Sequence, residues 1–97
     1  MIWTIEYTRT AETQLRKLDK QIAGRILDYL ETKIAALENP RVRGKALSGP
    51  LGDLWRYRIG DYRVICEIQD HVMRILVVEA GHRKQIYKLR IPTKSST

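Results

Sequence analysis

Residues 54–87 read LWRYRIGDYRVICEIQDHVMRILVVEAGHRKQIY, and this stretch decides the fold. β-Branched and aromatic residues flank Gly60-Asp61, a dipeptide that suits a two-residue type II′ hairpin with glycine at its first central position. A second turn at Asp70-His71 leads into VMRILVV, a run typical of a strand. The stretch predicts three consecutive antiparallel strands, followed by a basic Gly-His-Arg turn.

The first hairpin predicts two chemically different sheet faces. We expect Ile59 to pair with Tyr62 across the turn. Arg58 then lies directly opposite Arg63, and Arg56 shares their face because side chains alternate with period two. The other face carries the predicted core residues of these two strands and the next one: Trp55, Tyr57, Ile59, Tyr62, Val64, Cys66, Ile68, Ile75 and Val77.

The three arginines point to a missing anion. Like charges directly opposite each other destabilise a sheet, and no carboxylate is predicted beside Arg58 and Arg63. The one glutamate we expect on this face, Glu67, is better placed to meet Arg74. A phosphate chain is the obvious ligand, because the guanidinium fork matches phosphate oxygens bidentately.

The N-terminal half predicts a strand and two helices. Residues 2–7 (IWTIEY) form the strand, and Thr8 or Thr10 can cap the first helix. Asp19 can cap a second helix, which Asn39-Pro40 ends. The apolar stripes of the two helices are Ala11, Leu15 and Leu18, then Ile22, Ile26, Leu30, Ile34 and Leu37.

The fold class is therefore α+β. We expect a twisted antiparallel β-sheet, built from the N-terminal strand and a three-stranded meander, with a helical hairpin packed on one face. Residues 1–91 are expected to form a single domain, and residues 92–97 a polar, disordered tail.

The net charge of +7 is confined to the second half of the chain. Residues 1–40 carry six Lys or Arg and six Asp or Glu, so residues 41–97 hold the other twelve basic and five acidic residues. Part of the excess lies in the predicted loop 39–53, at Arg41, Arg43 and Lys45. Such asymmetry favours RNA, DNA or an acidic protein as partner, with a merely solvated basic surface as the alternative.

Several classes of chemistry are absent from the sequence. Cys66 is the single cysteine, so there is neither an internal disulfide nor metal-ligand spacing, and we expect it to be a buried packing residue. There is no P-loop, dinucleotide fingerprint or zinc-protease motif. No apolar run approaches the ~20 residues of a membrane span, so the expected location is cytoplasmic. The remaining arginines, His82 and Tyr87 require neither a metal nor a cofactor.

The chain resembles the RelE/ParE superfamily of bacterial toxins. The resemblance rests on LSGPLGDLWRYRIGDYRVICEI followed by VVEAGHRKQIY, in a strand–helix–helix–three-strand order. It implies a toxin of a type II toxin-antitoxin system, neutralised by an acidic antitoxin. The RelE branch contains endoribonucleases that cut mRNA, typically in the ribosomal A site, by attack of the 2′-hydroxyl on the adjacent phosphate.

The resemblance also implies roles for individual residues. By position, the family's catalytic set falls on Arg56, Arg58, Arg63, Arg83 and Tyr87. The residues expected to contact RNA around it are Arg41, Arg43, Lys45, His82 and Lys84.

The general base is left open by the sequence. Arginines occupy the two first-strand positions where the founding RelE type has lysines, and arginine does not readily lose a proton. Arg56 and Arg58 are therefore interpreted as electrostatic stabilisers, with Tyr87 as the first candidate base and His82 as the second. The alternatives are a ParE-like toxin that poisons DNA gyrase without nuclease activity, and an inactive antitoxin-binding module.

Overall fold

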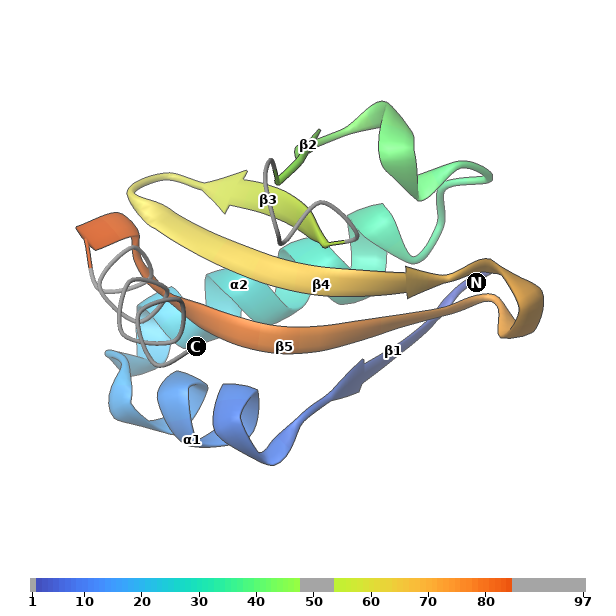
Figure 1. Cartoon of the computed structure of the whole chain (residues 1–97). Coiled ribbons are helices and arrows are strands. Elements are labelled where there is room, and N and C mark those ends of the chain that lie inside the picture. The colour runs from blue at the N-terminus through green and yellow to red at the C-terminus, as the bar shows by residue number, and fades with distance from the viewer. Residues whose placement is uncertain (1, 48–53, 85–97) are drawn as a thin grey trace, which may run out of the picture.

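A computed structural model describes residues 2–47 and 54–84 of the chain. Strand β1 (Thr4–Tyr7) leads into helices α1 (Arg9–Lys17) and α2 (Lys20–Asp28). A short edge strand β2 (Lys45–Ala46) precedes the meander of β3 (Trp55–Ile59), β4 (Tyr62–Gln69) and β5 (Arg74–His82). The sheet order is β1-β5-β4-β3-β2, and α2 lies behind the sheet in the view of Figure 1.

The sheet is mixed rather than wholly antiparallel. The meander β3-β4-β5 is antiparallel, as predicted. Strand β1, however, runs parallel to β5, with Thr4 beside Arg74 and Tyr7 beside Val77. The prediction of an antiparallel N-terminal strand is wrong. The helices carry the chain from β1 to β2 at the opposite edge of the sheet, and the meander then brings β5 back beside β1 in the same direction.

The first hairpin has the predicted register. Gly60 has a φ of 61°, and Asp61 does not have a positive φ, as a type II′ turn requires. Ile59 pairs with Tyr62, and Arg58 pairs with Arg63. The second turn is longer than predicted: a 3-10 turn at Asp70–Val72 ends in left-handed Met73, which has a φ of 51°.

Both helices begin at predicted caps. The hydroxyl of Thr8 accepts a 3.1 Å hydrogen bond from the Ala11 N–H, and Asp19 accepts a 3.0 Å bond from the Gln21 N–H. The second helix continues beyond α2 as a π-helical turn over Tyr29–Ile34. Within residues 2–47 and 54–84, neither helix is long and apolar enough to cross a bilayer.

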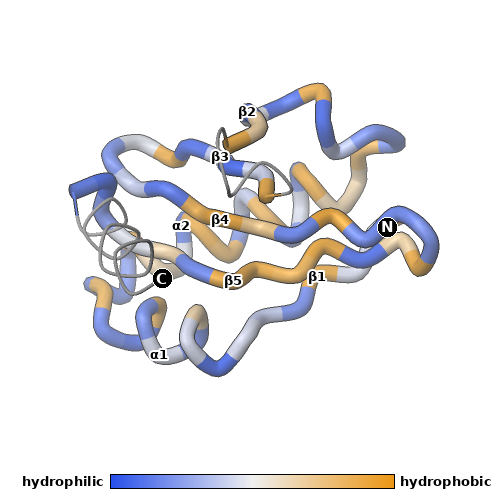
Figure 2. The backbone as a smooth tube through the Cα atoms, viewed as in Figure 1, coloured by the Kyte–Doolittle hydropathy of each residue, from blue (hydrophilic) through white to orange (hydrophobic). Residues whose placement is uncertain are grey.

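The core lies between the helices and one face of the sheet, as predicted. Figure 2 shows hydrophobic residues concentrated along β4 and β5. Every residue of the predicted sheet core is either buried in this cluster or packed against it, as Trp55 is. The fully buried members from the two layers include Ala11, Ile26, Leu30, Ile34, Tyr57, Val64, Cys66, Ile75 and Val77.

A β-bulge in β5 changes which residues share a face. Cys66 pairs with Val77, whereas its neighbour Ile65 pairs with Glu79, so Val78 is the extra residue. Before the bulge, odd-numbered residues such as Val77 face the core. After the bulge the phase is reversed, and Glu79 moves to the face opposite the helices.

The segment before β2 is held against β3, although the sequence predicted only a loop there. The Tyr57 hydroxyl donates a 2.7 Å hydrogen bond to the carbonyl of buried Pro40. The Trp55 indole donates another of 2.7 Å to the Arg43 carbonyl. Gly44 permits this approach, since a Cβ there would lie 2.3 Å from the Arg56 carbonyl oxygen.

Gly44→Ala should destabilise the protein by about 1–3 kcal/mol, because its φ of +80° strains any other residue and the added Cβ would clash with β3. The matched control is Gly24→Ala in α2, where a Cβ meets nothing within 4 Å. That helical change should instead stabilise by up to about 1 kcal/mol. Urea unfolding of both variants measures the difference, and equal effects would contradict the assigned backbone strain.

Candidate functional site

Four basic side chains define the cationic face of the sheet: Lys45, Arg56, Arg58 and Arg63. Lys45 on β2 pairs with Arg56 on β3, and Arg58 pairs with Arg63 on β4. All four lie on the side away from the helices, because their strand neighbours, such as Tyr57 and Val64, face the core. The structure therefore brings together the three hairpin arginines predicted from the sequence.

Arg63 is the central group of the cationic face. Its side chain is only 5% exposed, and within the described residues its Nε finds no hydrogen-bond acceptor. Arg58 stands directly opposite it, so each guanidinium repels the other. Burying an unpaired cation beside another costs free energy that an anionic ligand would recover. The arrangement is suited to binding a phosphate.

Glu79 is the residue that sequence reasoning missed. The bulge at Val78 places it directly across from Ile65, in the same row as Arg56 and diagonal to Arg63. Alternation from Ile75 and Val77 would have put Glu79 in the core. A carboxylate at a position that demands an apolar side chain was the available signal that the strand contains a bulge.

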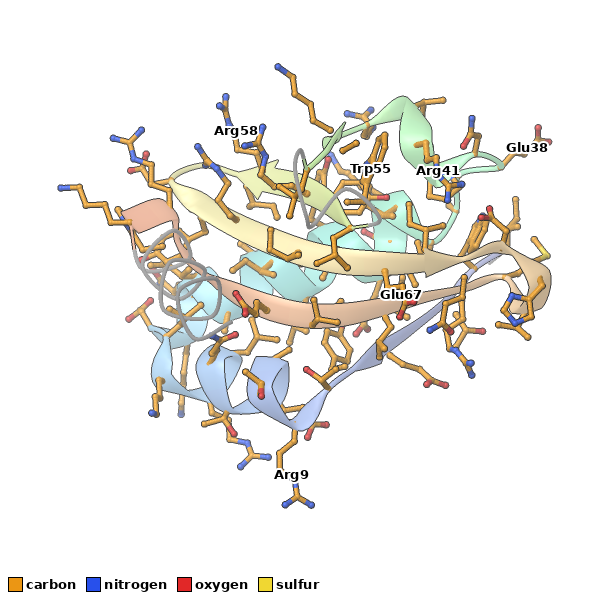
Figure 3. The ribbon with its side chains drawn as sticks, viewed as in Figure 1. Arg9, Glu38, Arg41, Trp55, Arg58 and Glu67 are labelled. Carbon is orange, nitrogen blue, oxygen red and sulfur yellow. The ribbon has the colours of Figure 1, made fainter. Side chains whose placement is uncertain are left out.

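Glu67 is on the same face but does not meet Arg74, so that predicted contact is wrong. Its carboxylate accepts a 3.1 Å hydrogen bond from the Gln69 amide. Arg74 Nε donates to the Gln69 carbonyl oxygen at 2.6 Å, and Arg74 Nη1 lies 3.9 Å from Glu6. Figure 3 shows Arg58 toward the β3–β4 turn and Glu67 toward the other end of the sheet.

The structure does not bring His82 to the cationic face. His82 pairs with Tyr62, and the two rings meet edge to face with centroids 5.4 Å apart. Tyr62 itself packs against the core, so His82 lies on the helix side of the sheet. Since the bulge reverses the alternation of β5, it removes His82 from the site as it adds Glu79.

Arg83 and Lys84 follow β5 directly, and both are exposed. The Arg83 N–H donates a 3.0 Å hydrogen bond to the Asp61 carbonyl, which ties it to the hairpin turn beside Arg58 and Arg63. Tyr87, the predicted domain end at residue 91 and the predicted tail at 92–97 lie outside the described residues.

The basic residues of the loop have different surroundings. Arg41 makes two 2.9 Å hydrogen bonds to Asp70, one to each carboxylate oxygen. The bonded guanidinium holds the pKa of Asp70 below its usual range and raises that of Arg41. Lys45 points to the cationic face, whereas Arg43 is exposed beside Trp55.

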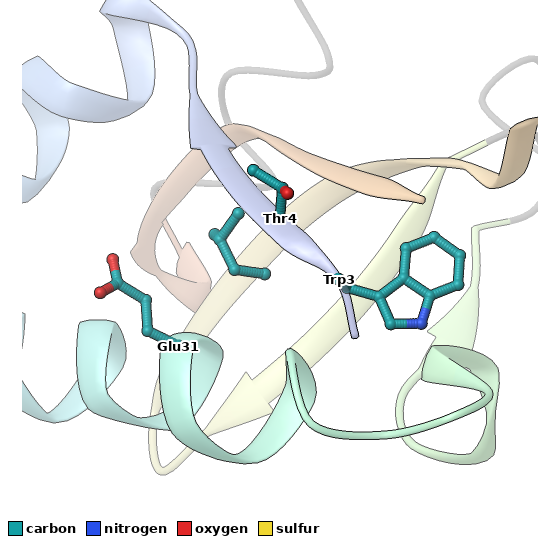
Figure 4. A pocket seen from close by; sticks show the side chains of 4 residues that line it. Trp3, Thr4 and Glu31 are labelled. Carbon is teal, nitrogen blue, oxygen red and sulfur yellow. The ribbon is translucent and has the colours of Figure 1, made fainter. Parts of the chain in front are cut away.

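Two other titratable groups among the described residues lie in or against the core, away from the cationic face. Burial raises the pKa of Tyr7, whose hydroxyl donates a 2.5 Å hydrogen bond to Glu31, and burial likewise raises the pKa of Cys66. An open hollow of about 310 Å³ is lined by Trp3, Thr4, Ile5 and Glu31 (Figure 4). It lies beside edge strand β1, away from the cationic face on β2–β4. Within residues 2–47 and 54–84, no three His, Cys, Asp or Glu side chains gather as metal ligands do.

Comparisons with known proteins agree with this architecture. Residues 5–87 match the family model of the ParE toxin of the type II toxin-antitoxin system parDE. The chain is 31% identical over 85 residues to Toxin RelE of Mycobacterium tuberculosis. The aligned residues cover 88% of this chain and 86% of the relative. It is 27% identical over 88 residues to Toxin RelG of the same organism, covering 91% and 99%.

The fold also matches a solved complex. The crystal structure of the toxin-antitoxin complex RelBE2 from M. tuberculosis superposes with a TM-score of 0.77 at 25% identity, over 86% of this chain and 93% of that chain. The protein is a type II toxin-antitoxin toxin and belongs to the RelE/ParE superfamily. The resemblance to this superfamily is thereby confirmed. The predicted Gly-His-Arg turn is wrong, because Gly81 and His82 belong to strand β5.

Asp70→Asn should lower stability at neutral pH and have no effect at strongly acidic pH. The pKa of Asp70 is depressed in the folded state, so its ion pair stabilises the fold above the unfolded-state pKa and is lost as the pH falls through the folded-state pKa. Urea unfolding across the acid range should show the two proteins converge. The control is Asp28→Asn, at an exposed carboxylate with no ion pair among the described residues; a gap that persists at acid pH would contradict the mechanism.

Proposed function

We propose that this toxin is a metal-independent endoribonuclease that cleaves mRNA. The observation that carries the proposal is the buried, unpaired guanidinium of Arg63 beside Arg58. In the proposed reaction the 2′-hydroxyl attacks the adjacent phosphate, giving a 2′,3′-cyclic phosphate and a 5′-hydroxyl. Negative charge builds on the equatorial oxygens as the 2′-oxygen approaches, and fixed guanidinium groups stabilise that charge.

The residues have distinct roles in this proposal. Arg63 and Arg83 hold the scissile phosphate, while Arg56 and Arg58 supply further positive potential. Lys45 and Arg43, with Lys84, contact the flanking RNA backbone. Tyr87 keeps its predicted place in the catalytic set.

The relatives support this reading and extend it to partners. The two curated relatives are the toxins RelE and RelG, and the matching structure is a toxin-antitoxin complex. We infer that a cognate acidic antitoxin neutralises this chain by covering or distorting the cationic face. The ribosomal A site is the proposed place of cleavage, and the cytoplasm the proposed compartment.

A second function is favoured by the family model, which is that of a ParE toxin. A ParE-like toxin would inhibit DNA gyrase and would not cleave RNA. The arginine set of the hairpin and Arg83 favours the nuclease, since the gyrase poisons lack most of it.

Primer extension on mRNA from expressing cells, with plasmid supercoiling assayed in parallel, separates the two functions. New mRNA 5′ ends with unchanged supercoiling would support the nuclease. Lost supercoiling without cleavage would support gyrase inhibition. Because arginines supply all the charge stabilisation proposed, cleavage of a short free RNA by the purified protein should continue in EDTA, and its loss on chelation would overturn the metal-independent mechanism.

Arg63→Met should lower the single-turnover cleavage rate by about 10²–10³. The same change should raise the free energy of unfolding by roughly 1–4 kcal/mol, because methionine fills the buried site without a charge. Arg74→Met is the matched control on the same face, where the guanidinium has Gln69 and Glu6 as partners. It should leave cleavage nearly unchanged and give no gain in stability. An Arg63→Met variant that is less stable than the wild type and still cleaves RNA would contradict the assignment of Arg63 to the site.

Lys45→Ala should weaken RNA binding and reduce the slope of log affinity against log salt by about one, as for a single phosphate contact. Arg41→Ala should change that slope less, because Asp70 already pairs with the Arg41 guanidinium. Filter binding of a short RNA from low to high salt measures both slopes. An equal reduction of the salt slope in both variants would indicate that Arg41 contacts the RNA as well.

A further inference from the structure

Glu79 is a half-buried carboxylate set among the arginines of the proposed ribonuclease site. Resting on that proposed function, we propose that Glu79 is the general base, accepting the proton of the attacking 2′-hydroxyl. Glu79 lies on the cationic face because of the bulge at Val78. The alternation of apolar residues along β5 would have placed it on the core face.

The register places Glu79 within reach of the reacting atoms. Arg63 pairs with Gly81, so Glu79 is diagonal to Arg63 across β4 and β5. Diagonal neighbours are about 7–8 Å apart, a gap that a glutamate and an arginine side chain can close around one ribose-phosphate unit. The Oε1 atom of Glu79 and the Nε atom of Arg63 are both buried from solvent. Low solvent exposure strengthens the interaction of both groups with a bound substrate.

Tyr87, the first candidate base from the sequence, lies outside the described residues, and the other candidates on the cationic face are less suited to the role. Glu67 is exposed, and its carboxylate accepts a hydrogen bond from the Gln69 amide. It is four residues from Arg63, a separation of about 13 Å along the strand. His82 lies on the helix side against Tyr62. The arginines remain protonated at any physiological pH and cannot act as bases.

The proposed step moves one proton and exchanges one bond. The 2′-O–H bond breaks with its proton passing to the Glu79 carboxylate, the 2′-oxygen–phosphorus bond forms, and the bond from phosphorus to the 5′-oxygen breaks. Protonated Glu79 then returns the proton, through water, to the departing 5′-oxygen. The proton is thus transferred from the 2′- to the 5′-oxygen with no water consumed, and Glu79 is regenerated.

The charged groups that face Glu79 are known for each neighbouring strand among the described residues. Arg63 and Glu67 come from β4 and Arg56 from β3, with Lys45 beyond it on β2. Glu67 is the other carboxylate among these groups, and its own substitution controls for its contribution. An acid limb of the rate profile that depends on residue 79 therefore reports the carboxylate.

The test is single-turnover cleavage of ribosome-bound mRNA by the full chain and by Glu79→Gln, with Glu67→Gln as the matched control. Glu79→Gln should lower the cleavage rate by about 10²–10⁴ while leaving RNA affinity equal or tighter, since a negative charge has been removed. The wild-type rate should fall tenfold per pH unit in its acid limb, and Glu79→Gln should lose that limb. Glu67→Gln should resemble the wild type in rate and pH profile.

Controls separate a base from a structural residue and from a failure of the proposed function. Glu79→Asp, which keeps the carboxylate, should recover part of the rate, and thermal melts should show both variants folded. If Glu79→Gln fails to fold, Glu79→Asp must retain the acid limb or the proposal is overturned. Folded Glu79→Gln that cleaves at the wild-type rate, or keeps the limb, also overturns it. If the wild type does not cleave at all, the ribonuclease function itself is wrong.

Discussion

The two-residue turn at Gly60 and Asp61 fixes the register of β3 against β4, and the site depends on that register. A shift of one residue would exchange the two faces of the hairpin, placing arginines in the core and Tyr57 and Val64 in solvent. The apolar face excludes this shift because it is packed beneath the helices. The register thereby forces Arg58 and Arg63 into direct opposition on the other face. Core formation and assembly of the cationic face have the same cause.

The bulge at Val78 is the second constraint, and it decides which side chains of β5 share the cationic face. One extra residue in β5 leaves the core positions of Ile75 and Val77 intact while reversing the faces of everything that follows. Glu79 joins the arginines, and His82 packs against Tyr62 on the other side.

Burial of the Arg63 guanidinium opposite Arg58 lowers the stability of the fold. The guanidinium is almost wholly buried, and it faces another cation. Stabilising contacts lie elsewhere: the aromatic side chains of β3 hold the β2 segment through the carbonyls of Pro40 and Arg43, and Arg41 joins the same segment to Asp70. These contacts around the cationic face offset the cost of burying the Arg63 guanidinium.

The sequence by itself determined the α+β class, the Asp19 cap, the first hairpin and the shared face of Arg56, Arg58 and Arg63, and it narrowed the first cap to Thr8 or Thr10. Each of these is encoded locally, by a turn dipeptide, a capping side chain or an alternation of period two. Only the tertiary structure decided the direction of β1, the edge strand β2, the bulge in β5 and the pairing of Arg41 with Asp70. These depend on contacts between residues far apart in the chain, such as Thr4 with Arg74, because local propensity carries no information about which strand will become the neighbour. Glu79 therefore lies on the cationic face, and His82 on the opposite one, because of a bulge that is defined only by the pairing of β5 with β4.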